Sequence, residues 1–96
     1  MSTFTDEEVT VALEELPGWS VDGDAITKTY EFADFRAALD FMNRAAGPIE
    51  EMDHHPEWSN VYNKVEVRLS SHDVGGITDR DARLATVLER VADASS

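Results

Sequence analysis

The alternation of apolar and polar residues divides this chain into helical and extended stretches. Apolar residues recur at helical spacing in three places, after Thr5, after Asp34 and after Thr78, and each of these residues is of a type that caps a helix. Residues 19–32 and 57–71 instead alternate as strands do, and a turn divides each stretch. The pattern predicts one α+β domain over residues 1–96, an antiparallel sheet covered by helices in the order α-β-β-α-β-β-α.

Local signals mark where several of these elements begin and end. Glu8 follows Thr5 at the spacing of a capping box, and Pro17-Gly18 ends the first helix. Asp22-Gly23 is a favoured turn between two strands, and residues 60–63 can form the second turn. These signals predict two hairpins that alternate with three helices.

The helix after Asp34 contains a conflict. Its predicted core-facing residues are Phe35, Ala38, Leu39, Met42, Ala45, Ala46 and Ile49. Gly47-Pro48 interrupts this row, and a proline inside a helix removes a hydrogen bond at a cost of about 3 kcal/mol. Because proline is accepted in a first turn, we expect the helix to kink or to restart at Pro48 and run to about Met52.

Charge and composition exclude several classes of function. Twenty Asp and Glu against eight Lys and Arg give a net charge of −12, and such a surface repels nucleic acids and anionic membranes. Cysteine is absent, which excludes thiolate sites. No apolar run reaches the roughly 18–20 residues of a membrane span, and the first residues do not resemble a signal peptide. We therefore expect a cytoplasmic protein that binds neither nucleic acid nor membrane.

The same acidic surface allows a hypothesis about habitat. Only Lys28 and Lys64 are lysines, and acidic, lysine-poor surfaces suit proteins dissolved in concentrated salt. A halophilic source is one interpretation, and simple solubility is the other.

The three histidines are the candidate chemistry. His54 and His55 lie side by side in the stretch 50–58, and His72 follows in Ser70-Ser71-His72-Asp73. Adjacent side chains diverge by about 100° on a helix and about 180° on a strand, so one imidazole can enter a pocket while the other assists. Histidine titrates near neutrality, which suits general acid or base work.

Neighbouring residues offer support for such a site. Glu50 and Asp53 supply carboxylates that could grip a donor-rich ring or hold a histidine tautomer, and Trp58 supplies a flat surface for stacking. The plainer interpretation is an exposed histidine pair without a role. Zinc also accepts such ligands, but neighbours that point apart rarely share one ion, so we expect no metal.

At these residues the chain resembles the pterin-4a-carbinolamine dehydratase family. The resemblance rests first on Glu50, followed after three residues by His54-His55-Pro56 and then by Glu57-Trp58. It continues with the run Asn-Val-Tyr-Asn-Lys-Val at 60–65 and with nine residues between Tyr62 and His72. It ends with Asp81 at the start of the last helix. Length and element order agree as well, so the resemblance covers nearly the whole chain. It implies a four-stranded antiparallel sheet with three helices on one face.

The resemblance also implies an activity and a site. The reaction is dehydration of a 4a-hydroxytetrahydropterin, the 4a-carbinolamine, to quinonoid dihydropterin and water by histidine acid–base catalysis. His54, His55 and His72 become the catalytic residues, without an assignment of acid and base. Asp81 is expected mainly to start a helix. The residues implied to bind the pterin are Glu50, Asp53, Pro56, Trp58, Ser70, Ser71 and Asp73.

The resemblance implies no metal or organic cofactor, and it implies assembly as a dimer or tetramer. Two alternatives stay open: a non-catalytic partner-binding or dimerisation-cofactor module of the same fold, and a role on a related pterin in molybdenum-cofactor metabolism. Retention of all three histidines favours an enzyme, because a binding module has no chemical use for them. Gly47-Pro48 falls where the family keeps an unbroken helix, which puts the geometry of Glu50 and Asp53 in question.

Overall fold

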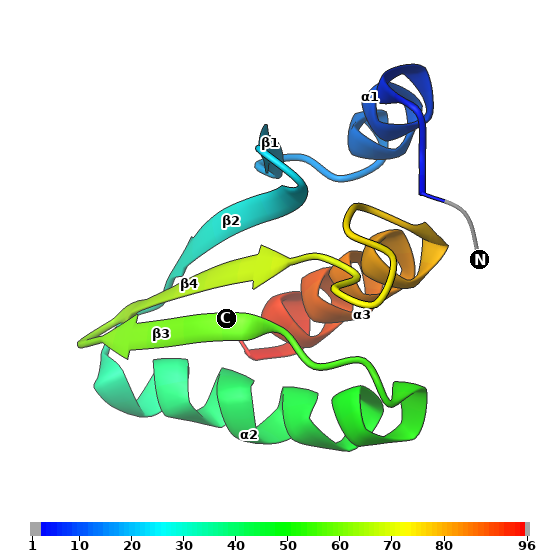
Figure 1. The fold of residues 1–96 in the computed structure, drawn as a ribbon. Helices are drawn as coiled ribbons and strands as arrows, with labels where there is room; N and C mark the ends of the chain where they lie inside the picture. The colour runs from blue at the N-terminus through cyan, green and yellow to red at the C-terminus, as the bar shows by residue number, and fades with distance from the viewer. Residues whose placement is uncertain (1–2, 96) are drawn as a thin grey trace.

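The computed structural model describes residues 3–95, which form three helices and one four-stranded sheet (Figure 1). The order of elements is the predicted one. Within the described residues, no helix is long and apolar enough to cross a membrane. The elements are α1 (Asp6–Glu14), β1 (Ser20–Asp22), β2 (Ala25–Glu31), α2 (Phe35–Met52), β3 (Glu57–Val61), β4 (Lys64–Leu69) and α3 (Asp79–Ser95).

The sheet is antiparallel throughout, with the strand order β1-β2-β4-β3. Asp22 pairs with Ala25, so Gly23 and Asp24 form the two-residue turn of the first hairpin. Gly23 has a φ of 63°, which glycine adopts without strain. In the second hairpin Tyr62 takes the left-handed conformation, with a φ of 52°. Both predicted hairpins are therefore present.

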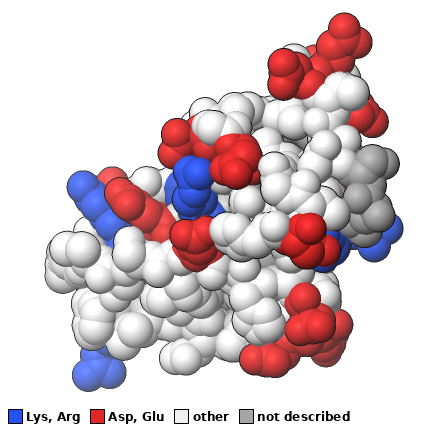
Figure 2. All heavy atoms as spheres, in the orientation of Figure 1, with Lys and Arg blue, Asp and Glu red and all other residues white. Residues whose placement is uncertain are grey.

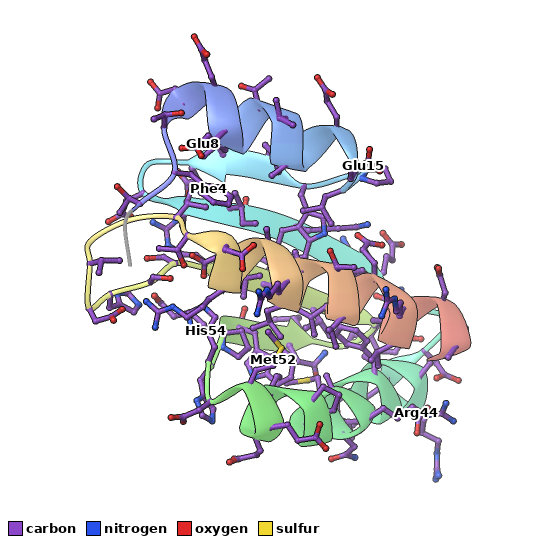
Figure 3. The ribbon with its side chains drawn as sticks, turned by 90° about the vertical axis from the view of Figure 1, so that its right-hand side faces the viewer. Phe4, Glu8, Glu15, Arg44, Met52 and His54 are labelled. Carbon is purple, nitrogen blue, oxygen red and sulfur yellow. The ribbon has the colours of Figure 1, made fainter. Side chains whose placement is uncertain are left out.

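One face of the sheet is covered by helices and the other is open (Figure 1). Figures 1 and 3 place the three helices on the same side of the sheet, as predicted, with α2 and α3 packed together. Because side chains alternate along a strand, Tyr30 and Val65 face the helices and are buried, whereas Thr29 and Glu66 lie on the open face. The candidate site lies where elements of the sheet layer and of the helix layer end.

The expected break in α2 is absent. The helix runs from Phe35 to Met52 and includes Pro48, so the predicted restart at that residue is wrong, whereas the predicted end at about Met52 is confirmed. Ala45 and Ile49 lie on either side of Pro48 and are both buried in the core. Packing on both sides compensates for the hydrogen bond that proline cannot make.

The buried face of α2 also differs from the predicted row. Phe41 is fully buried, although the prediction left it out, whereas Phe35 and Leu39 are 46% and 40% exposed. Phe41 packs against Tyr30 of β2 and against Phe32, the residue that follows this strand, with ring centroids 5.0 and 5.1 Å away. The contact with these aromatic rings decides which side of the helix faces the core.

Candidate active site

The site begins where α2 ends. Asp53 takes a left-handed conformation with a φ of 49°, and its backbone N–H donates to the carbonyls of Glu50 and Ile49. This turn directs the next two side chains differently. His54 is only 8% exposed, whereas the His55 side chain is 56% exposed. One imidazole is therefore held inside the protein and its neighbour stands in solvent.

The buried imidazole meets a carboxylate from α3. Nε2 of His54 lies 2.6 Å from Oδ1 of Asp81, and the Asp81 side chain is completely buried. Figure 3 shows His54 between the end of α2, near Met52, and the start of α3. A buried polar pair of this kind is stable only when both partners are hydrogen-bonded. The contact thus ties the two helices together at the site.

The second oxygen of Asp81 is also fully used. Oδ2 accepts hydrogen bonds from the Ser71 hydroxyl and from the backbone N–H of Thr78, each at 2.9 Å. Ser71 Oγ lies 2.8 Å from Thr78 Oγ1. Asp81 therefore closes the cap of α3, as expected of a helix-start residue, and also binds His54, which the sequence did not indicate.

His72 lies in the loop between β4 and α3, beyond the end of the strand at Leu69. Its side chain is 73% exposed, and its Nε2 lies 3.0 Å from Oε1 of Glu57, the first residue of β3. The structure therefore joins the two histidine-containing stretches twice, through His72 and Glu57 and through Ser71, Asp81 and His54.

Arg80 holds the loop of His72 against α3. Its Nη2 donates to Oδ1 of Asp73 at 2.7 Å. This hydrogen bond and the charge of the guanidinium lower the pKa of Asp73 below its usual value. The loop is closed by a hydrogen bond of 2.8 Å from the Ser71 N–H to the Gly76 carbonyl. Arg80 was not predicted, because only the folded chain brings it to this loop.

The remaining predicted residues differ in their access to solvent. Glu50 is exposed and lies 3.6 Å from Nε2 of His55, and Asp53 is also exposed. Pro56 is half-buried, and Ser70 is buried. The carboxylates at the end of α2 therefore remain available to a ligand.

Trp58 lies between the core and the open face of the sheet. Its ring packs edge-on against Phe41, with centroids 6.3 Å apart. Trp58 and Glu57 also line a cavity of about 450 Å³ on the open face, together with Thr27, Thr29, Ser59, Glu66, Arg68 and their neighbours. No histidine lines this cavity, but Glu57 links it to His72.

The three histidines of the site have different charged partners. Among residues 3–95, no three His, Asp or Glu side chains are grouped so that they could hold a metal ion. Each histidine instead has its own carboxylate partner: Asp81, Glu50 and Glu57. Each imidazole therefore has one ring nitrogen beside a carboxylate oxygen.

Comparisons with known sequences identify a family. The family model described as Pterin 4 alpha carbinolamine dehydratase matches residues 2–91. A protein of Nitrobacter winogradskyi, named "Putative pterin-4-alpha-carbinolamine dehydratase", is 55% identical over 91 residues, which are 93% of this chain and 90% of the relative. A protein of Burkholderia multivorans with the same name is 53% identical over 91 residues, or 93% and 89% of the two chains.

Solved structures agree with this result. A transcriptional coactivator/pterin dehydratase from Brucella melitensis is 43% identical, has a TM-score of 0.91, and matches over 95% of this chain and 99% of its own. A pterin dehydratase-like RuBisCO assembly factor of the α-carboxysome is 16% identical with a TM-score of 0.64, over 77% and 86% of the chains, and shows a shared fold only. By sequence and by structure, this chain belongs to the pterin-4a-carbinolamine dehydratase family.

Proposed function

We propose that this protein is a hydro-lyase that converts a 4a-hydroxytetrahydropterin to quinonoid dihydropterin and water by histidine acid–base catalysis. Family membership supports the substrate class. The observation that carries the mechanism is the buried His54 imidazole, 2.6 Å from the Asp81 carboxylate and joined through Ser71 to the loop of His72. An imidazole fixed by a carboxylate is well suited to accept or donate a proton at a defined position.

The reaction needs two proton transfers and no change in oxidation state. The C4a–O bond breaks, a proton joins the departing oxygen, and water leaves. A ring N–H gives up its proton as the new double bond forms. One group must therefore act as acid and another as base, and two histidines in different protonation states satisfy both needs.

The surroundings of the three histidines differ in the way that such a division requires. His54 is buried against a carboxylate, whereas His55 and His72 are largely exposed. The buried ring is held in one orientation by its carboxylate partner, whereas the exposed rings can turn in solvent. This difference supports separate roles for the buried ring and the exposed rings.

The proposal includes the expected cytoplasmic location and the expected assembly as a dimer or tetramer. Phe35 and Leu39 lie one turn apart on α2 and are 46% and 40% exposed. Apolar side chains exposed next to each other are typical of surfaces that contact another protein. They support the association of copies, which light scattering on the purified protein measures.

The dehydration rate tests the proposal. The 4a-carbinolamine is generated in situ, and its loss is followed spectroscopically with wild type, His54→Ala, His55→Ala and His72→Ala. At least one substitution is expected to lower the rate by about 100-fold or more, as for the loss of an acid–base group. Asn43→Ala, at an exposed position of α2, is the control and keeps the wild-type rate.

A wild-type protein no faster than buffer would contradict the proposal and would favour the partner-binding module or another pterin. Adding a chelator to the same assay tests for metal. The acid–base mechanism predicts that the rate stays unchanged, and a loss of activity would instead indicate a metal-dependent step.

A further inference from the structure

Two buried hydroxyl groups lie behind the His54–Asp81 pair, and no step of the proposed reaction uses them. Ser71 is 1% exposed and Thr78 is fully buried. Ser71 comes from the loop after β4, and Thr78 immediately precedes α3. Each hydroxyl has one hydrogen to donate and lone pairs with which to accept. The contacts around them decide where those hydrogens point.

The hydrogen bonds can be traced in one direction. The Ser71 hydroxyl donates its hydrogen to Oδ2 of Asp81 at 2.9 Å. Because that hydrogen is used, the 2.8 Å contact between the two hydroxyls requires Thr78 to donate to Ser71. Thr78 Oγ1 accepts in turn from the backbone N–H of Arg80 at 3.2 Å. Every bond in this chain points toward the Asp81 carboxylate.

An ionised Asp81 is consistent with this direction. Oδ2 receives two hydrogen bonds, from the Ser71 hydroxyl and the Thr78 N–H, and donors of this kind favour the ionised carboxylate. Oδ1 is then free to accept from His54 at 2.6 Å. The proton between the two side chains lies on Nε2 of His54, and in the neutral ring Nδ1 carries the lone pair.

We propose that Ser71 and Thr78 are positioning residues for His54: their hydroxyls hold Asp81 as an ionised carboxylate against Nε2, which makes Nδ1 the nitrogen that exchanges a proton with the substrate. Only the last clause rests on the proposed function. Ser71 was expected to line the pterin site, but its hydroxyl is committed to this network.

Charged groups near His54 must be held constant in a test. Asp73, in the loop after β4, interacts electrostatically with His54 and is itself bound by Arg80 of α3. Glu50 and Asp53 at the end of α2 and Glu57 of β3 lie on the neighbouring elements, where Glu50 pairs with His55 and Glu57 with His72. Ser71→Ala and Thr78→Val change none of these charges. A change in the titration of His54 in both variants would therefore arise from the hydroxyl chain.

Heteronuclear NMR of the imidazole nitrogens in the full-length protein is the direct test. The chain has three histidines, so His55→Gln and His72→Gln assign the signals. The wild-type neutral ring of His54 is expected to carry its hydrogen on Nε2. Ser71→Ala and Thr78→Val remove support from the carboxylate and make it a stronger base. The titration midpoint of His54 should rise by about half a pH unit or more, roughly a threefold gain in proton affinity.

Two controls separate this effect from helix capping and from general damage. Thr78→Ser keeps the hydroxyl and restores the wild-type midpoint. Thr86→Val removes an exposed hydroxyl of α3, which donates only to the Ala82 carbonyl at 2.9 Å, and leaves the midpoint unchanged. Thr78→Val also removes the cap of α3, whereas Ser71→Ala leaves it in place, so a shift shared by both variants does not come from the cap.

Dehydration kinetics on the same proteins complete the test. Ser71→Ala and Thr78→Val should lower kcat about tenfold with little change in KM, since the working ring is misplaced and the substrate contacts remain. A wild-type ring protonated on Nδ1, or unchanged midpoints in both variants, would overturn the proposal. An inactive wild type whose midpoints shift as expected would refute the proposed function and still support the hydroxyl chain.

Discussion

Tyr30 lies on the covered face of β2, where its ring contacts those of Trp19, Phe32 and Phe41. The residue is 6% exposed, and its hydroxyl makes no hydrogen bond to any described residue. Burial, together with the negative charge of Glu89, raises the pKa of Tyr30 far above its usual value. The folded protein therefore keeps the phenol proton at a pH at which the unfolded chain has lost it.

This residue should make stability depend on pH in the alkaline range. The unfolded chain binds fewer protons once its tyrosine ionises near about pH 10, so the free energy of unfolding falls as the pH rises above that value. Tyr30→Phe should remove much of this fall. It should also cost little at neutral pH, because it deletes an unpaired buried hydroxyl. Urea unfolding at about pH 8 and about pH 10.5 measures both effects.

Tyr62→Phe is the matched control, because Tyr62 is 63% exposed. It should keep the alkaline loss of stability seen in wild type. The same pH dependence in wild type and Tyr30→Phe would show that the buried phenol is not its source.

Single residues also show how far the sequence could predict the site. The different orientations of His54 and His55 could be predicted from the sequence. Adjacent side chains diverge in regular structure, and a following proline favours an extended backbone at His55. The contact of His54 with Asp81 joins residues 27 positions apart. No local pattern encodes it, since it depends on how α3 packs beside the end of α2. The contact of Arg80 with Asp73 spans only seven positions, but it depends on how the loop after β4 folds back against the start of α3.

Among the elements, those defined by local chemistry were predicted best. The capping box of Thr5 and Glu8 and the hydrogen bond of the Asp34 side chain to the Ala37 N–H are both present. The continuity of α2 was missed because a local rule about Pro48 competes with packing along the whole helix. The buried face of α2 was predicted incorrectly because its apolar residues allow more than one side of the helix to face the core. The rings of Tyr30 and Phe32 pack against Phe41, and this contact fixes which side is buried.

The unbroken α2 predicts that Gly47 is a weak point of that helix. A Cβ added at Gly47 would meet no atom within 4 Å, and its backbone is helical. Gly47→Ala should therefore raise the free energy of unfolding by about 0.5–1 kcal/mol, because alanine loses less backbone entropy on folding. Chemical denaturation measures the change.

Gly23→Ala is the matched contrast for this substitution. Its added Cβ would also meet open space, but the φ of 63° strains any residue with a side chain, so this variant should be destabilised. A loss of stability in Gly47→Ala would mean that α2 is not a regular helix at this position.

At the scale of the whole molecule, negative charge dominates. The net charge is −12, and the face shown in Figure 2 carries more acidic than basic side chains. None of the three helices has a basic residue in its last turn, where one would complement the helix dipole. Repulsion among these carboxylates opposes folding and is screened by salt.

The melting temperature should therefore rise between low salt and about molar KCl. Exposed ion pairs such as Arg83 with Asp79 weaken in salt, but pairs of this kind contribute about 0–1 kcal/mol each. In a double variant, Glu14→Gln with Glu15→Gln, the melting temperature should rise less with added salt than it does in wild type. A melting temperature that stays constant or falls would argue against net repulsion and against a halophilic source.

A double-mutant cycle on the dehydration rate tests most directly whether His54 and Asp81 work as one catalytic unit. Wild type, His54→Gln, Asp81→Asn and the double variant are compared with the carbinolamine generated in situ. Each single substitution should lower kcat by about tenfold or more, and the double variant should be no slower than His54→Gln, because Asp81 acts through His54. If the losses in kcat of the two single variants multiply in the double variant, or if His54→Gln keeps the wild-type rate, His54 and Asp81 do not act as one catalytic unit.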